Sequence, residues 1–175
     1  MIRKSSLTKE QALQKARHYC AYQERCHSEV KEKLYSFGLW KKDVEEAISL
    51  LIEENYLNEE RFALQFAGGR FRMKHWGRIR IRYELKQRQV SEYCIKKALA
   101  AIDEEDYLLA LEKLAAAKWE SLGAEKPETA ETAGTARTTG TNSFIRRGKL
   151  QEYLIRKGYE SGLISQTLKA IGEKS

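Results

Sequence analysis

Residues 77–85 read GRIRIRYEL, and this stretch decides between two fold classes. Arginine and isoleucine alternate along it with a period of two, which by itself is typical of a half-buried β-strand. As a helix, the same residues form one apolar face and a separate basic face made of Arg78, Arg82 and Lys86. No other segment of the sequence resembles a strand, and an isolated strand cannot satisfy its backbone hydrogen bonds. We therefore predict a helix here and an all-α protein.

The stretch lies in the most basic part of the chain. Between Arg70 and Lys97, ten lysines and arginines stand against two acids, whereas the whole chain carries a net charge of only +7. Exposed cations often do no more than solvate a helix face, but such a concentrated excess favours a polyanion or an acidic protein surface as partner. The candidate binding residues are Arg70, Arg72, Lys74, Arg78, Arg80, Arg82, Lys86 and Arg88.

Trp76 stands among these cations and allows two interpretations. Its ring could stack on a nucleic-acid base, or it could seal the junction between two helices beside Gly77. Arginine suits phosphate and carboxylate equally well, so the pattern leaves the chemistry of the partner open.

A repeat runs through the apolar positions. Four apolar positions of a first copy recur 51 residues later in a second copy. They recur again, with the same internal spacing, a further 69 residues on in a third copy. These spacings predict three tandem three-helix repeats, at residues 7–56, 57–105 and 106–175, stacked into an elongated, curved solenoid. The repeated positions are Leu34, Val44, Ile48 and Leu51, then Leu85, Ile95, Leu99 and Ile102, then Leu154, Ile164, Leu168 and Ile171.

The third repeat contains a low-complexity segment, GAEKPETAETAGTARTTGTNS, at residues 123–143. Because it has no large apolar side chain, it cannot bury enough surface to offset the entropy of ordering. We predict a disordered insertion between the first and second helices of that repeat.

The remaining composition excludes several classes of protein. No apolar run approaches the roughly 18 residues of a membrane span, and the start, MIRKSSLTKEQ, lacks the apolar core of a signal peptide. Cys20, Cys26 and Cys94 are an odd number at irregular spacing, which indicates reduced thiols. We expect a cytoplasmic protein that does not contact a membrane.

The sequence contains no recognisable catalytic site. It has no glycine-rich phosphate loop, no nucleophile elbow and no pair of carboxylates with a histidine. A cluster of His18, Cys20, Cys26 and His27 suggests zinc, but it lacks the C-x-x-C spacing of such sites. We expect no enzymatic activity, no cofactor and no metal.

Four segments resemble the RecX family of recombination regulators: SEVKEKL at 28–34, NYLNEERFA at 55–63, WGRIRIRYELKQRQV at 76–90 and LQEYLIRKGYESGLI at 150–164. The resemblance implies three tandem three-helix repeats in a monomer. It also implies binding to RecA and to its filament on single-stranded DNA, and it leaves direct contact with DNA open. Such binding would restrain strand exchange and ATP hydrolysis in recombination, DNA repair and the SOS response.

The chain departs from the family pattern at three places. Asn58-Glu59 replaces two aspartates, and the 123–143 insertion is unusual. Gln89 occupies a glycine position in the turn of the second repeat, where a positive φ would cost a non-glycine residue about 1 kcal/mol.

Two other functions fit the same residues. The last two helices of each repeat are similar to a helix-turn-helix, which would make the chain a sequence-specific DNA-binding protein. Its predicted reading helices offer few side chains suited to base edges, and residues 41–54 are net acidic. A single-strand nucleic-acid-binding protein that acts without RecA is the third hypothesis.

Overall fold

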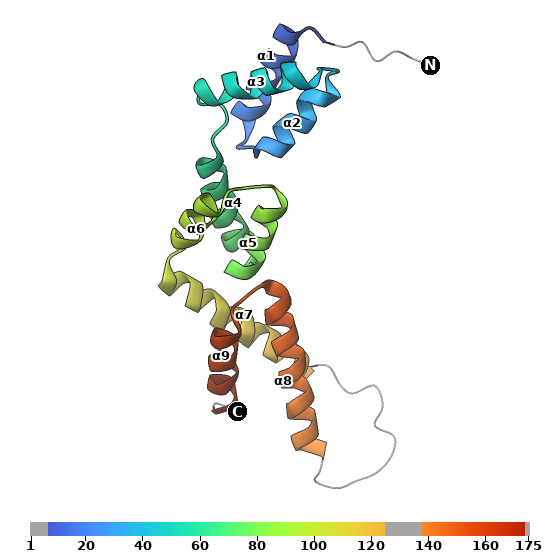
Figure 1. Ribbon diagram of the computed structural model, residues 1–175. Helices are drawn as coiled ribbons and strands as arrows, with labels where there is room; N and C mark the ends of the chain where they lie inside the picture. Colours follow the sequence, from blue (N-terminus) through green and yellow to red (C-terminus); the bar gives the residue numbers. More distant parts are fainter. Residues whose placement is uncertain (1–6, 125–137, 174–175) are drawn as a thin grey trace, which may run out of the picture. The chain divides into compact units, whose positions relative to one another are not determined.

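The computed structural model describes residues 7–124 and 138–173, and every regular element in those ranges is an α-helix (Figure 1). The ambiguous stretch at 77–85 lies almost entirely in a helix, so the prediction of an all-α protein is confirmed. No helix in the described ranges is long and apolar enough to cross a membrane. The helices are α1 (Lys9–Tyr22), α2 (His27–Ser36), α3 (Lys41–Glu53), α4 (Glu59–Lys74), α5 (Arg78–Gln87), α6 (Glu92–Ala100), α7 (Glu104–Ala124), α8 (Thr138–Lys157) and α9 (Ser161–Glu173).

The chain divides into two compact units. The first runs up to Gly69 and also takes in Arg82–Ala101, whereas the second takes in Arg70–Ile81 and the chain from Ile102 onward. Two of these boundaries fall inside α4 and α5. The division into repeats at 7–56, 57–105 and 106–175 therefore remains a prediction about sequence units.

The predicted repeat is visible in where the helices start. α5 begins 51 positions after α2, α6 begins 51 positions after α3, and α9 begins 69 positions after α6. Each copy also buries equivalent apolar side chains, which is what a shared three-helix core requires. These buried side chains are Leu34, Leu85 and Leu154 from the second helices, and Val44, Ile95 and Ile164 from the third helices.

The helices on either side of the low-complexity segment are longer than predicted. α7 continues to Ala124 and α8 begins at Thr138, so the limits 123 and 143 of the predicted disordered insertion are wrong at both ends. A formed helix extends at little cost because each added residue gains a hydrogen bond without a new nucleation step. The central part of the predicted insertion, residues 125–137, lies outside the described residues.

The turn before the third helix of each repeat contains a residue with positive φ. Gly38 has φ 87°, Gln89 has φ 59° and Gly158 has φ 90°. The positive φ predicted for Gln89 is confirmed. Glycine adopts this conformation without steric cost, whereas the Cβ of Gln89 meets its own backbone there.

Replacing Gln89 with glycine should therefore stabilise the chain by about 0.5–1 kcal/mol. The exposed Gln65, in the middle of α4, provides a matched control, since glycine in a helix interior should cost about 1 kcal/mol. Urea unfolding followed by circular dichroism would measure both changes. A loss of stability in Gln89→Gly would contradict the strain assigned to this turn.

An ion pair joins the first and third helices of each of the first two repeats, with the charges reversed. Lys9 of α1 pairs with Glu46 of α3, whereas Glu60 of α4 pairs with Lys97 of α6 at 2.7 Å. Glu46 and Lys97 are equivalent positions, 51 residues apart, and so are Lys9 and Glu60. We call these two ion pairs the clasps.

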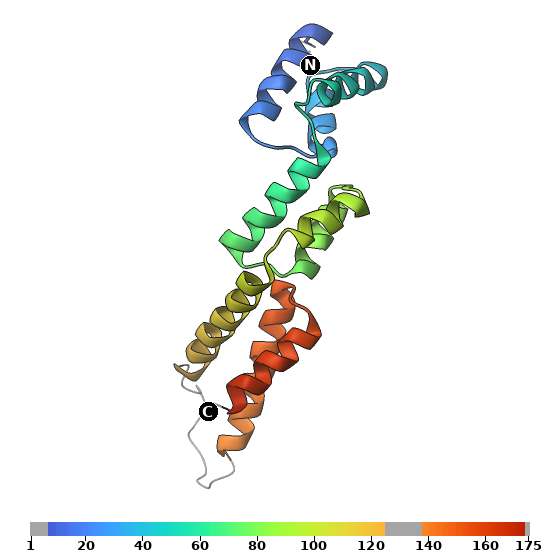
Figure 2. The same cartoon turned by 90° about the vertical axis from the view of Figure 1, so that its left-hand side faces the viewer.

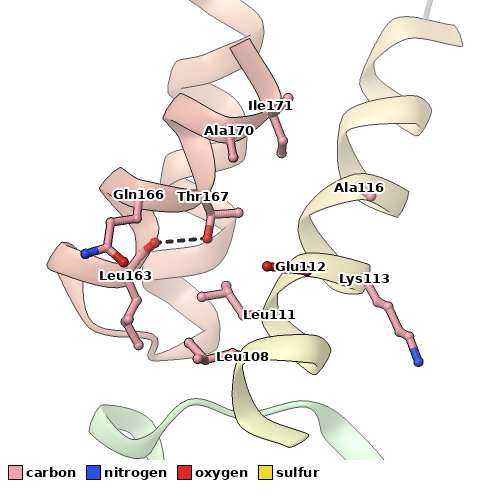
Figure 3. A pocket seen from close by; sticks show the side chains of 10 residues that line it. All are labelled: Leu108, Leu111, Glu112, Lys113, Ala116, Leu163, Gln166, Thr167, Ala170 and Ile171. Carbon is pink, nitrogen blue, oxygen red and sulfur yellow. Dashed lines mark hydrogen bonds between the residues drawn. The ribbon is translucent and has the colours of Figure 1, made fainter. Parts of the chain in front are cut away.

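The third repeat has a groove where the clasp would be. The position equivalent to Lys97 is Gln166, and the position equivalent to Glu60 is Leu111. Between α7 and α9 lies a cavity of about 530 Å³ with a largely apolar lining (Figure 3). Its lining side chains are Leu108, Leu111, Glu112, Lys113, Ala116, Leu163, Gln166, Thr167, Ala170 and Ile171.

Candidate anion-binding site

Within the described part of the chain, carboxylates pair with Arg78, Arg82, Lys86 and Arg88, all of which belong to the predicted binding cations. Because surface ion pairs are weak, such pairing does not remove an exposed cation from a binding surface, but it does compensate its charge. The pairs are Arg78 with Glu104 at 2.7 Å, Arg82 with Glu92 at 3.1 Å, Lys86 with Glu92 at 3.4 Å and Arg88 with Glu84 at 2.8 Å. All three residues of the predicted basic helix face belong to this group.

Arg78 has a structural role in the second unit. Its side chain is only 21% exposed, and its guanidinium lies 4.1 Å from the centre of the Tyr107 ring. Burial alone would lower the pKa of Arg78, but the hydrogen bond and charge of Glu104 outweigh burial and raise it. Arg78 therefore ties the start of α5 to α7.

The start of α5 is capped by the end of α8. The amide of Gly77 donates to the Lys157 carbonyl at 2.8 Å, and the amide of Ile79 donates to the Gly158 carbonyl at 3.0 Å. The amide of Arg78, between them, donates to the Tyr107 hydroxyl at 2.9 Å. These three amides would otherwise lack partners at a helix N-terminus. Residues about 80 positions apart in the sequence thus meet through their backbones.

A group of cations surrounds Trp76 in the second unit. We name Arg70, Lys74, Trp76, Arg80 and Lys157 the Trp76 cluster. The charged groups of Arg80, Arg70 and Lys74 lie 4.2, 5.2 and 6.0 Å from the centre of the indole ring. Distances of up to about 6 Å permit cation–π attraction. The indole is half-buried and positions these cations.

Three cations of the Trp76 cluster are not neutralised. Among the residues that the structure describes, no carboxylate lies within ion-pair distance of Lys74, Arg80 or Lys157. Burial lowers the pKa of Lys157, and the charges of Arg80 and Lys74 lower it further. Positive charge is thus gathered here without compensation, which is the electrostatic condition for binding an anion.

Lys157 is not among the predicted binding residues, because the whole of α7 lies between it and the basic stretch in the sequence. The one sequence signal at Lys157 was the helix break at Lys157-Gly158-Tyr159, which indicated a turn. It did not indicate that Lys157 lies near the basic stretch. Arg72, another of the predicted binding cations, is exposed on α4. The assignment of the eight cations to a binding surface stays a prediction.

The candidate zinc cluster does not form in the part of the chain that is described. No three His, Cys, Asp or Glu side chains gather there in a way that would hold a metal ion. Cys20, Cys26 and Cys94 are free and buried, and burial raises the pKa of the Cys20 thiol to about 11. A thiol with such a pKa stays protonated and unreactive at neutral pH.

Comparison with known proteins identifies relatives over most of the chain. A model of the second three-helix domain of RecX matches residues 58–99. The regulatory protein RecX of Prosthecochloris aestuarii is 28% identical over 159 residues, which cover 90% of this chain and 91% of the relative. RecX of Clostridium perfringens (strain SM101) is 30% identical over 77% of this chain, but the match covers only 56% of the relative.

Solved structures show the same fold. RecX from Lactobacillus salivarius superposes with a TM-score of 0.75 at 17% identity, over 94% of this chain and 96% of the other. A second regulatory protein RecX gives 0.74 at 20% identity, over 91% of this chain and 70% of the other. The two structures share the fold of this chain. The domain match at 58–99 and the Prosthecochloris protein show which family the chain is similar to, the RecX family of regulatory proteins.

Proposed function

We propose that this protein binds RecA and the filament that RecA forms on single-stranded DNA, and that it lowers the recombinase and ATPase activities of that filament. The observation that carries the proposal is the match of the second RecX domain to residues 58–99, the segment that contains all eight predicted cations. Similarity to the family supplies the kind of role, and the basic segment supplies a surface for a negatively charged partner.

The proposed mechanism is occlusion. A basic surface bound along the filament would compete with the second DNA strand and would hinder the motions linked to ATP turnover. No catalytic group is needed, because the effect comes from binding alone. The uncompensated cations of the Trp76 cluster are the better candidates for contact than the paired Arg82 and Lys86, since the latter must exchange Glu92 for a new partner.

The DNA-dependent ATPase of RecA, measured with substoichiometric amounts of this protein, tests the proposal. The double variant Lys74→Gln/Arg80→Gln should need about a hundredfold more protein to halve the ATPase rate, because it removes two charge-assisted contacts. The matched variant Arg82→Gln/Lys86→Gln removes the same charge from paired positions and should have a smaller effect. An ATPase rate that the wild-type protein does not change would refute the proposed function.

A helix-turn-helix mode of DNA reading has less support. It would use α6, where Lys97 already pairs with Glu60 and where Glu92 holds Arg82 and Lys86. An equal affinity for random and selected duplexes is expected, and a strong site preference in such a binding assay would favour the alternative.

A further inference from the structure

Backbone carbonyls hold two cations of the Trp76 cluster in place. Arg80 donates from Nη1 to the Arg156 carbonyl at 3.0 Å, and Lys157 donates from Nζ to the Lys74 carbonyl at 3.0 Å. A carbonyl is a dipole without net charge, so it fixes the position of a cation and leaves its positive charge available. The lowered pKa of Lys157, caused by burial and then by Arg80 and Lys74, shows that these charges act on one another.

The indole ring of Trp76 also restrains Arg80. The Arg80 guanidinium lies 4.2 Å from the ring centre, a distance typical of a cation resting on an aromatic face. A face covered in this way is not open to a nucleic-acid base. Trp76 therefore orders Arg80 before any ligand arrives, which reduces the entropy lost on binding.

Three amides at the nearby helix N-terminus already have acceptors. The amides of Gly77, Arg78 and Ile79 donate to the Lys157 carbonyl, the Tyr107 hydroxyl and the Gly158 carbonyl. The charged donors for an anion at this place are therefore side chains. Such a site recognises charge and shape and cannot distinguish one base from another.

We propose that Lys74, Arg80 and Lys157 form a phosphate-binding site beside Trp76, in which Lys157 of α8 completes a site begun by the basic stretch. Three separate cationic donors suit a tetrahedral oxyanion with several acceptor oxygens better than a planar carboxylate, for which one guanidinium suffices. The inference deepens the proposed function and rests on it, since the phosphate would be a phosphodiester of the single strand in the filament.

Binding of a labelled oligothymidylate strand without RecA tests the site directly. Fluorescence anisotropy should show about tenfold weaker binding by Lys157→Gln than by the wild-type chain, as expected for the loss of one charge-assisted contact. The plot of log K against log salt should also be less steep for Lys157→Gln. Its negative slope should be smaller in magnitude by about 0.7, the value for one phosphate of a single strand. Lys169→Gln, which removes an exposed lysine from α9, is the control and should bind as the wild type does. Equal affinities of the two variants would overturn the proposal.

The wild-type protein provides a second readout, for which the variant Lys157→Gln serves only to assign a resonance. In carbon-13 spectra of labelled lysine side chains, inorganic phosphate should raise the pKa of Lys157 toward its ordinary value of 10.5, because a bound anion favours the charged ammonium. The Lys157 resonance is identified by its absence from the spectrum of Lys157→Gln. A pKa that phosphate leaves unchanged would overturn the proposal.

Competition experiments identify the source of the anion. If an oligoglutamate peptide of equal charge displaces the strand as well as unlabelled oligothymidylate does, the site is a docking surface for acidic protein and the phosphate assignment is wrong. If phosphate raises the pKa of Lys157 while strand affinity does not depend on Lys157, the ligand is free phosphate or a nucleotide. The assignment to a phosphodiester of the DNA strand is then wrong.

The site and the proposed function can fail separately. Strand binding that depends on Lys157, together with an unchanged RecA ATPase, would uphold the phosphate site and refute the regulator. An inhibited ATPase together with equal strand binding by Lys157→Gln and Lys169→Gln would refute the phosphate site and support the regulator.

Discussion

Replacing Gly77 with alanine should destabilise the second unit by about 3 kcal/mol or more. A Cβ atom at this position would lie 2.1 Å from the Gly158 carbonyl oxygen, 2.3 Å from its carbon and 2.4 Å from the Tyr159 nitrogen. These are backbone atoms, which cannot rotate away as a side chain can. The helices must separate to admit the methyl group, and the hydrogen bonds of Gly77 and Ile79 to α8 would be lost with their contact.

Urea unfolding would measure the loss, and Gly69→Ala is its control. A Cβ at Gly69 meets nothing within 4 Å, and the residue lies inside α4. Alanine there should stabilise the helix by about 0.5–1 kcal/mol, because glycine loses more backbone freedom on folding. If Gly77→Ala lowers the free energy of unfolding and Gly69→Ala raises it, the contact of Gly77 with α8, and not helix propensity, determines the effect. If Gly77→Ala kept the wild-type midpoint, the close approach of α5 and α8 would be incorrect.

Removing the hydroxyl of Tyr107 should cost about 1–3 kcal/mol. The ring is fully buried, and its hydroxyl accepts from the Arg78 amide at 2.9 Å while donating to Glu160 at 2.7 Å. Tyr107→Phe keeps the shape of the ring and leaves the Arg78 amide without its acceptor. Burial raises the pKa of Tyr107 far above its ordinary value, so the hydroxyl remains a donor at neutral and mildly basic pH.

Tyr159→Phe is the matched control for Tyr107→Phe. The two rings lie 5.1 Å apart between their centres, and both are buried. The Tyr159 hydroxyl has no hydrogen-bond partner among the described residues. Its removal should leave stability unchanged or raise it by up to about 1 kcal/mol, since a buried unpaired hydroxyl is costly. Thermal unfolding of both variants would measure the difference, and equal losses would contradict the bridging role of Tyr107.

The helical repeat could be predicted because its signal is local. Within each helix the apolar positions follow the helix period, and the equivalent residues Leu34, Leu85 and Leu154 are buried as expected. The choice of helix over strand at 77–85 rested on the whole sequence, which offers no second strand for pairing. The predicted limits of the insertion at 123–143 differ from the observed helix ends, because α7 and α8 extend into the segment. Such extension depends on helix cooperativity, which the apolar pattern does not reveal.

The candidate site was harder to predict because charge compensation depends on distant residues. Nothing near Arg78 in the sequence indicates that Glu104 and Glu160 lie beside it. Nor does the sequence indicate that Lys157 joins the cations around Trp76. A count of charges along the chain finds the region of excess, whereas only the three-dimensional contacts show which of those cations remain uncompensated.

The two clasps carry their charges in opposite order, with the lysine on the first helix in one repeat and on the third helix in the next. This order has a consequence for the folding pathway. Tandem repeats with similar cores are prone to misassembly, in which a helix of one copy packs into another. If α1 packed against α6, Lys9 would face Lys97, and if α4 packed against α3, Glu60 would face Glu46. Both exchanges bring like charges together, whereas both native pairings join opposite ones. The two ion pairs therefore disfavour exchange between the first two copies while the chain is still collapsing, and favour the pairing of α1 with α3 and of α4 with α6.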